Sequence, residues 1–353
     1  MRLARERRFP DFSAHFTRWR EAWNQRPWRS FDMITLFSPN TPAVLTGCHP
    51  DVLMRYFHPP LARRSVTIFY RAGWSMEHEP SLQDRVAAIH RAQRKFPRHR
   101  YIFAANTPRE VELIAAHGIR AEYLNENAFI DEHTFHPDEA EARIFDAVLD
   151  AQIAPYKRLE LASEVPRLVV VTGVMKGRFD PEYSLNVRRA LAGAVWANGE
   201  YWSDSYRSLP REEVAQVYRR ARVGLCLSAR EGANLASIQY LLSGLSVVST
   251  PSEGGRDVFF SDEYAAIVPP EAAAVARAVA KFAAEHLPPE TIRQRVLDKI
   301  WMIRRRFAEI LCRELGHAEI NEDWWRHFNT QNRLRYQDLR VIAKALMQSP
   351  DPS

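Results

Sequence analysis

The sequence predicts an α/β protein of two domains, each with a parallel β-sheet covered by helices. Three observations support this prediction. The chain has 353 residues, which exceeds the roughly 250–300 at which a single hydrophobic core stops growing. Short apolar runs alternate with helical patterns along most of its length, as parallel sheets require. The residues 228–260 predict a loop, a helix, a short apolar strand and a Gly-Gly loop, in that order.

The first half of the chain has five short apolar runs that predict strands. They lie at 34–37, 43–46, 66–70, 101–104 and 121–124. Residues 1–30 have a polar and aromatic helical pattern, and 83–94 has a clear amphipathic one. A further helix should begin after Thr107, because Thr107 and Glu110 have capping-box spacing and Pro108 occupies the first helical position. Gly118 should end that helix.

The second half repeats the alternation. Predicted strands lie at 145–149, 168–172, 194–196, 223–227, 245–249 and 265–268, with a helix at 210–220 and another that begins near Asn234. The chain from 271 to 344 is mostly helical, with an interruption at 287–289. We therefore predict a shortened first domain over 1–135, a second domain over 136–320, and a C-terminal helical tail over 321–353.

Composition excludes several classes of protein. No apolar run approaches the roughly 18–20 residues of a membrane span, and the basic start has no signal-peptide pattern. We expect a cytoplasmic protein. The formal net charge is +6, with basic patches at 2–8 and 304–306, which favour peripheral contact with the inner face of an anionic membrane. No nucleic-acid-binding motif is present.

The residues within 228–260 indicate the chemistry. Glu231 and Gly232 come just before a helix, and Gly254 and Gly255 open a second loop. Backbone N–H groups at helix starts and glycine turns bind anions such as phosphate. A carboxylate beside them would repel phosphate, so it should accept hydrogen bonds from hydroxyls. Phosphate and hydroxyl recognition side by side indicate a nucleotide-sugar.

This stretch resembles the C-terminal domain of retaining GT-B glycosyltransferases of the group-1 type, which includes glycogen synthases and mannosyltransferases. That family carries two glutamates separated by seven residues, then a helix, a G-x-P-V-V-x-T segment and a Gly-Gly loop. The matching residues here are Glu231, Gly232, Gln239, Gly244, Val247, Val248, Thr250, Gly254 and Gly255. Gln239 replaces the second glutamate, and Ser246 replaces the usual proline. The resemblance implies two Rossmann-like domains facing each other across a cleft, with C-terminal helices.

The resemblance also implies roles for these residues. Glu231 would contact the donor sugar, and Gln239 would lie at the ribose. The donor-binding residues would be Gly232, Ala233, Asn234, Leu235, Ala236, Gln239, Gly254, Gly255 and Arg256. Lys157 and Arg158 follow the first strand of the second domain, where family members place cations against the donor diphosphate. Such cations stabilise the charge that develops on the leaving group, so we expect neither a metal ion nor a cofactor.

The first domain matches less well. Many family members place a histidine after an early strand, and Arg71 occupies that place here. Together with Glu231, Lys157 and Arg158, Arg71 completes the predicted catalytic set. His49 and His78 are nearby candidates on the acceptor side. The segment 123–137 resembles the passage between the two GT-B domains.

The predicted function is transfer of a sugar from a nucleotide-sugar to a glycan, lipid or small-molecule acceptor, with retention of configuration. Three alternatives stay open. One is another GT-B enzyme class, a sugar phosphorylase or an epimerase. The second is a catalytically degenerate GT-B protein acting as a binding or scaffold subunit, which Gln239 and the missing histidine favour. The third is a nucleic-acid binder that uses the basic surface.

Overall fold

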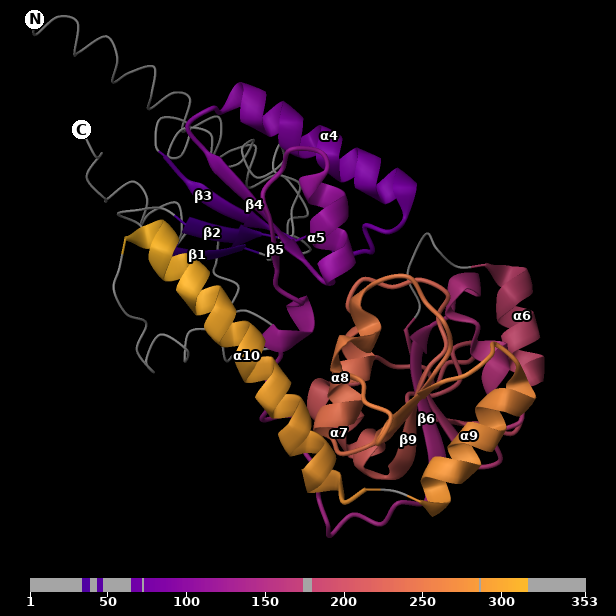
Figure 1. Cartoon of the computed structure of the whole chain (residues 1–353). Coiled ribbons are helices and arrows are strands. Elements are labelled where there is room, and N and C mark those ends of the chain that lie inside the picture. The colour runs from indigo at the N-terminus through magenta and orange to yellow at the C-terminus, as the bar shows by residue number, and fades with distance from the viewer. Residues whose placement is uncertain are drawn as a thin grey trace, which may run out of the picture. The chain divides into compact units, whose positions relative to one another are not determined.

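The structure is a computed structural model that describes residues 65–71, 73–173, 180–285 and 287–316 in full and two further strands, Ile34–Ser38 and Ala43–Thr46, by their backbone. It divides into two compact units, shown in Figure 1. The first comprises Met1–Glu126 together with a segment from Arg306 onward, and the second comprises Asn127–Arg305. This division falls inside 123–137, the segment that the sequence singles out as the passage between domains. His49 and the leader over 1–30 lie outside the described residues.

The first unit contains a five-stranded sheet in the order β1-β2-β3-β4-β5. β1 (Ile34–Ser38) runs antiparallel to β2 (Ala43–Thr46), whereas β2, β3 (Thr67–Tyr70), β4 (Arg100–Ala105) and β5 (Ala121–Tyr123) are mutually parallel. The helices are α4 (Glu79–Lys95) and α5 (Pro108–Ala115). Strands and helices share a core that includes Ile68, Val86, Ile89, Phe103 and Ile114. All five predicted strands of this half are confirmed.

The start of α5 differs from the predicted capping box in one respect. Thr107 Oγ1 accepts a hydrogen bond from the backbone N of Glu110 at 3.0 Å, and Pro108 occupies the first turn, as predicted. The Glu110 carboxylate, however, does not turn back to Thr107. It accepts hydrogen bonds from the backbone N of Met76 at 2.9 Å and of Asn106 at 2.7 Å. Glu110 therefore joins the loop after β3 to the loop after β4.

The second unit contains a fully parallel six-stranded sheet in the order β11-β10-β9-β6-β7-β8. Its strands are β6 (Phe145–Gln152), β7 (Leu168–Gly173), β8 (Val195–Trp196), β9 (Ala221–Cys226), β10 (Ser246–Ser249) and β11 (Ala265–Ile267). The first strand, β6, lies at the centre, and the chain builds outward from it in both directions. This is the doubly wound order, in which the connections change direction between β6 and β9.

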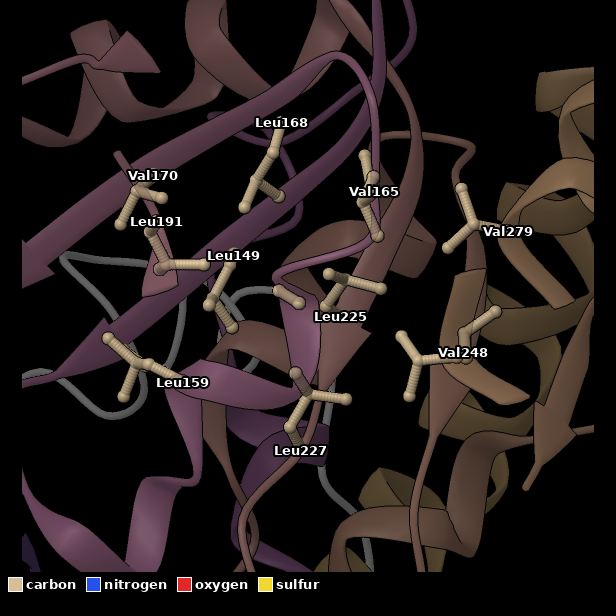
Figure 2. Close-up of a cluster of buried hydrophobic side chains, with 14 of the residues drawn as sticks. Leu149, Leu159, Val165, Leu168, Val170, Leu191, Leu225, Leu227, Val248 and Val279 are labelled. Atoms are coloured by element: carbon tan, nitrogen blue, oxygen red, sulfur yellow. The ribbon is translucent and has the colours of Figure 1, made fainter. Parts of the chain in front are cut away.

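Helices pack on the sheet of the second unit. They are α6 (Pro181–Ala190), α7 (Arg211–Arg219), α8 (Leu235–Leu242) and α9 (Ala272–Ala284). Figure 2 shows one cluster of the core, in which Leu149, Val170, Leu225 and Val248 from four strands meet Val279 of α9. Apolar runs on adjacent parallel strands produce this continuous buried layer, because helices cover such sheets and exclude water.

The last described helix, α10 (Pro289–Leu315), contributes residues to both units. The interruption predicted at 287–289 is confirmed, since α9 ends at Ala284 and α10 begins at Pro289. No helix in the described part of the chain is long and apolar enough to cross a membrane.

The predicted basic patch at 304–306 requires a correction. Arg304 is 1% exposed, and it donates to the backbone oxygens of Ala128 and Ile130, both at 2.7 Å, and to the Glu132 carboxylate. Burial opposes ionisation of Glu132, but the hydrogen bonds and charge of Arg304 outweigh it and lower the pKa of Glu132. Arg304 therefore holds the start of the second unit and is not a surface cation. The patch at 2–8 lies outside the described residues.

Candidate active site

The carboxyl ends of β6, β9 and β10 bring three loops together at the point where the sheet changes direction. In doubly wound sheets, ligands bind in the crevice at this position. Backbone hydrogen bonds fix the loops to one another. The N–H of Ala229 donates to Tyr156 O at 2.8 Å, and the N–H of Glu231 donates to Glu253 O at 3.0 Å. The loop that carries Glu231 is thus held from both sides.

Gly254 allows the loop after β10 to approach the loop after β9. Its φ of +101° belongs to the region that favours glycine. A Cβ atom at this position would lie 1.9 Å from the carbonyl oxygen of Glu231 and 2.9 Å from that of Gly232. The Gly-Gly loop of the sequence therefore has a steric purpose, because a side chain at 254 would push Glu231 out of position.

Glu231 accepts three hydrogen bonds on one oxygen. Its Oε1 accepts from Lys157 Nζ at 2.5 Å, from Ser228 Oγ, and from Asn234 Nδ2 at 3.2 Å. The side chain is 8% exposed. Its other oxygen, Oε2, has no hydrogen-bond partner among the described residues. Three fixed donors orient the carboxylate and leave Oε2 to accept from a ligand hydroxyl.

Lys157 lies in a short 3₁₀ turn, Pro155–Lys157, directly after β6. Its side chain is 15% exposed, and its ammonium lies 5.3 Å from the centre of the Tyr156 ring. The structure therefore brings together the two residues that the sequence analysis chose for different tasks, one for phosphate and one for sugar. A half-buried lysine with one carboxylate neighbour keeps further N–H donors for an anion.

Arg158, which the sequence assigns to the donor diphosphate, makes three hydrogen bonds within the protein. Its backbone is left-handed, with φ 51° and ψ 46°. Its guanidinium donates to Leu227 O at 2.7 Å, to Thr250 Oγ1 at 2.8 Å and to Pro251 O at 3.1 Å. These acceptors lie at the ends of β9 and β10. Most of the donors of Arg158 are thus engaged in holding the two strand ends together.

Arg256 and Gly255 also differ from the predicted donor contacts. Arg256 is 0% exposed, and its guanidinium donates to the carbonyl oxygens of Ser228 and Thr250. The N–H of Gly255 donates to Gly232 O at 2.7 Å. Arg256 also donates to Asp257 Oδ1 at 3.2 Å, so its guanidinium and the Gly255 amide are both engaged within the protein. The reason is that the two loops pack directly on each other, which a sequence motif does not reveal.

Helix α8 begins at Leu235 with Asn234 as its N-terminal cap, and the sequence predicts a start near Asn234. Asn234 Oδ1 accepts from the N–H of Ser237 at 3.3 Å, and Asn234 has a positive φ of 54°. Asn127 Nδ2 donates to the carbonyl oxygens of Ala233 and Asn234 and so fixes the residues before the helix. Ala233 is buried, and Leu235 and Ala236 are half-buried in the first turn. Strained backbone at both Asn234 and Arg158 concentrates at this edge, as it often does at functional sites.

Gln239 is 6% exposed and lies beside two residues that the sequence analysis missed. Its Oε1 is 3.5 Å from the hydroxyl of Tyr218, which donates to Asp150 Oδ2 at 2.5 Å. Asp150 lies on β6, near the carboxyl end. β6 contains two aspartates, Asp146 and Asp150, and an aspartate in a buried strand needs a partner, but no motif in the sequence distinguishes Asp150 from Asp146.

The predicted residues of the first unit are also described. Arg71 directly follows β3, is 4% exposed and forms a salt bridge with Glu126. The backbone N of Glu126 donates to Asn106 Oδ1 at 3.0 Å. His78 is the residue before α4, and its Nδ1 is 2.8 Å from Ser81 Oγ. His78 thus has a structural position at a helix start, whereas Arg71 belongs to a buried polar group at the carboxyl edge of the sheet.

No known protein family matches the chain, and neither does any curated protein. Solved structures do match. The crystal structure of Anabaena HepE in complex with UDP matches with a TM-score of 0.56 at 13% identity, over 77% of this chain and 78% of HepE. The UDP-glucose complex of HepE gives a TM-score of 0.54 at 13% identity, over the same shares of the two chains.

A third structure is that of an S. aureus TarM mutant in complex with fondaparinux, α-GlcNAc-glycerol and UDP. It matches with a TM-score of 0.53 at 13% identity, over 73% of this chain and 53% of that one. These similarities establish the fold. The chain has the α/β architecture of GT-B proteins, with two Rossmann-like domains, as the sequence predicts.

Proposed function

We propose that this protein is a glycosyltransferase that moves a sugar from a nucleoside diphosphate donor to an acceptor. The observation that carries the proposal is the contact between Lys157 and Glu231 at the switch point of the six-stranded sheet. One ammonium and one oriented carboxylate lie side by side where doubly wound sheets bind ligands. HepE and TarM, which share the fold, were crystallised with UDP.

Each residue of the pair has a distinct task in this proposal. Lys157 binds the diphosphate and stabilises the negative charge that grows on it as the glycosidic bond breaks. Glu231 accepts hydrogen bonds from donor-sugar hydroxyls through Oε2, while Lys157, Ser228 and Asn234 hold Oε1. Arg158 and Arg256 donate to backbone oxygens of the loops that carry the pair. The first turn of α8 adds backbone N–H groups and the positive end of a helix.

We further propose that transfer retains the anomeric configuration and needs no metal ion. Lys157 and the start of α8 supply the positive charge that a divalent cation would otherwise provide. Because Glu231 is assigned to the sugar hydroxyls, we propose front-face transfer, with the leaving phosphate taking the acceptor proton. Proton NMR of the anomeric configuration of the transferred sugar tests retention. Turnover in the presence of a chelator tests whether a metal ion is needed.

Binding and turnover test the proposal directly. Thermal-shift measurements with UDP, GDP, ADP, CMP and dTDP should show stabilisation by one or more of them, because ligands that bind the folded state raise its stability. Release of that nucleotide from its sugar conjugate then tests catalysis. Glu231→Gln should spare nucleotide binding and severely reduce release. Stabilisation by none of the five nucleotides would refute the proposal.

A second candidate function is binding without catalysis. Gln239 stands where a glutamate is usual, and Arg158 and Arg256 are committed to the scaffold. A binding or scaffold subunit would show nucleotide stabilisation with no release from any of a panel of nucleotide-sugars, with or without added acceptors. The two functions therefore differ in turnover and not in nucleotide affinity.

A further inference from the structure

Asp150, Tyr218 and Gln239 form a polar chain in the second unit. Tyr218 on α7 is 0% exposed, and its hydroxyl lies between the other two side chains, 2.5 Å from Asp150 Oδ2 and 3.5 Å from Gln239 Oε1. The N–H of Asp150 donates to the hydroxyl of Tyr240 at 2.6 Å. Three elements of the second unit, β6, α7 and α8, thus converge on one aspartate.

Close packing around two tyrosines accommodates the polar chain of Asp150, Tyr218 and Gln239. The rings of Tyr218 and Tyr240 lie 4.7 Å apart, and both are fully buried. A Cβ atom on Gly224 of β9 would lie 2.2 Å from the Tyr240 ring. Glycine at 224 therefore lets the tyrosine lie against the sheet. Buried polar groups are stable only when they are satisfied, and here two tyrosines are placed to satisfy one aspartate.

The Asp150 carboxylate has capacity for a ligand. Oδ2 is occupied by Tyr218, whereas Oδ1 has no hydrogen-bond partner within the described parts of the chain, and the residue is half-buried. Burial raises the pKa of Asp150, and the Tyr218 hydrogen bond and the positive charge of Lys157 oppose that rise. Asp150 is therefore within electrostatic reach of the cation that we assign to the diphosphate.

We infer that Asp150 is the acidic residue that binds the ribose diol of the donor, together with the neutral amide of Gln239. This inference rests on the proposed function and names a recognition residue for it. A vicinal diol offers two O–H donors. Asp150 Oδ1 accepts from one hydroxyl, and Gln239, which has both acceptor and donor atoms, binds the other. Hydrogen bonds to an ionised acceptor are the stronger kind.

The same geometry explains why residue 239 is neutral. A glutamate at 239 would place a second carboxylate against the Tyr218 hydroxyl, which has a single proton to donate. Two carboxylates that share one site repel each other, and one of them must take up a proton. The chain thus carries one acidic group at this position, on β6 instead of α8.

The test uses the full chain and calorimetry with UDP, 2′-deoxy-UDP and 3′-deoxy-UDP, or the same three forms of whichever base the thermal-shift panel selects. The wild type should bind the ribonucleotide at least about tenfold more tightly than one of the deoxy analogues, as expected for a hydrogen bond to a charged group. Asp150→Asn should remove most of this preference and leave affinity for that deoxy analogue unchanged. Asp146→Asn, on the same strand and paired with Arg167, is the control and should keep the preference.

Moving the carboxylate from position 150 to position 239 provides an independent readout. Gln239→Glu alone should lower the melting temperature at neutral pH, because it adds a second carboxylate to the Tyr218 hydroxyl. The double variant Asp150→Asn/Gln239→Glu should recover most of that loss and restore the preference for the ribonucleotide. Ribose preference that persists in Asp150→Asn, or no recovery in the double variant, would overturn the inference. Absence of nucleotide binding in the wild type would instead refute the proposed function itself.

Discussion

Lys157 Nζ lies 2.5 Å from Glu231 Oε1, although the two residues are 74 positions apart in the sequence. Each follows a different strand of the same parallel sheet, and the sheet order places β6 and β9 side by side. The carboxyl ends of adjacent parallel strands share one edge, so residues just beyond them meet. The pair in turn depends on Gly254, which admits the neighbouring loop against the backbone of Glu231.

We expect Lys157→Met to reduce turnover by about ten- to a hundredfold, because a charge-assisted hydrogen bond to phosphate contributes roughly 1.5–3 kcal/mol. Nucleotide affinity should fall as well. Lys281→Met, which removes an exposed lysine from α9, is the matched control and should leave both quantities unchanged. Steady-state release of nucleotide and calorimetry measure the two effects. Near-normal turnover in Lys157→Met would remove Lys157 from the phosphate site.

Gly254→Ala should lower both stability and activity. The added methyl group would lie 1.9 Å from Glu231 O, and the backbone has a positive φ, so the loop must move. We expect a cost of about 1–3 kcal/mol from strained backbone alone. Gly193→Ala is the control, since a Cβ there meets nothing within 4 Å. Equal melting temperatures for the two variants would contradict the close approach of the loop at Gly254 to the backbone of Glu231.

The architecture of this protein could be predicted from the sequence to a large extent, because strands in parallel sheets are short apolar runs and need no long-range information to recognise. The break before Pro289 and the helix start at Asn234 were also predictable, since both depend on local residues. Contacts that depend on three-dimensional proximity were not. Arg158 and Arg256 resemble phosphate ligands in sequence, yet their guanidinium groups bond to carbonyl oxygens of neighbouring loops.

The candidate role of Asp150 also could not be predicted from the sequence. It stands in a strand-like run with no motif around it, so nothing in its neighbourhood in the sequence indicates a function. Its partners, Tyr218 and Gln239, come from two helices further along the chain. Only the sheet order, which places β6 beside β9, brings these residues to one position. A family pattern in the sequence marks Glu231 and Lys157 as candidates, whereas no such pattern marks Asp150.

Arg256→Met should mainly reduce stability. The guanidinium of Arg256 is fully buried and donates to Ser228 O and Thr250 O. Its removal leaves these carbonyl oxygens without a charged donor, at a cost of roughly 1–3 kcal/mol for each buried unsatisfied group. Arg189→Met, on the exposed side of α6, serves as the control. Chemical unfolding followed by fluorescence measures the difference, and equal stability of the two variants would contradict the structural role.

Glu110 should make the stability of the protein depend on pH. Burial raises the pKa of Glu110 to about 7, from a usual value of 4.5, although the N–H groups of Met76 and Asn106 oppose the rise. Between these two values the folded protein keeps a proton that the unfolded chain has released. Stability from this group is therefore greater at pH 5.5 than at pH 7.5, by about 2 kcal/mol, and is lost as the pH rises through 7.

Glu110→Gln removes the titration, so we expect a smaller difference between the unfolding free energies at pH 5.5 and pH 7.5 than in the wild type. Other groups titrate in this range too, and for that reason the comparison of wild type and variant is the readout. Glu112→Gln changes an exposed glutamate on the same helix, paired with Arg109, and should leave the pH dependence as it is. Identical pH profiles for the wild type and Glu110→Gln would mean that Glu110 is ionised throughout, and that its two backbone hydrogen bonds outweigh its burial.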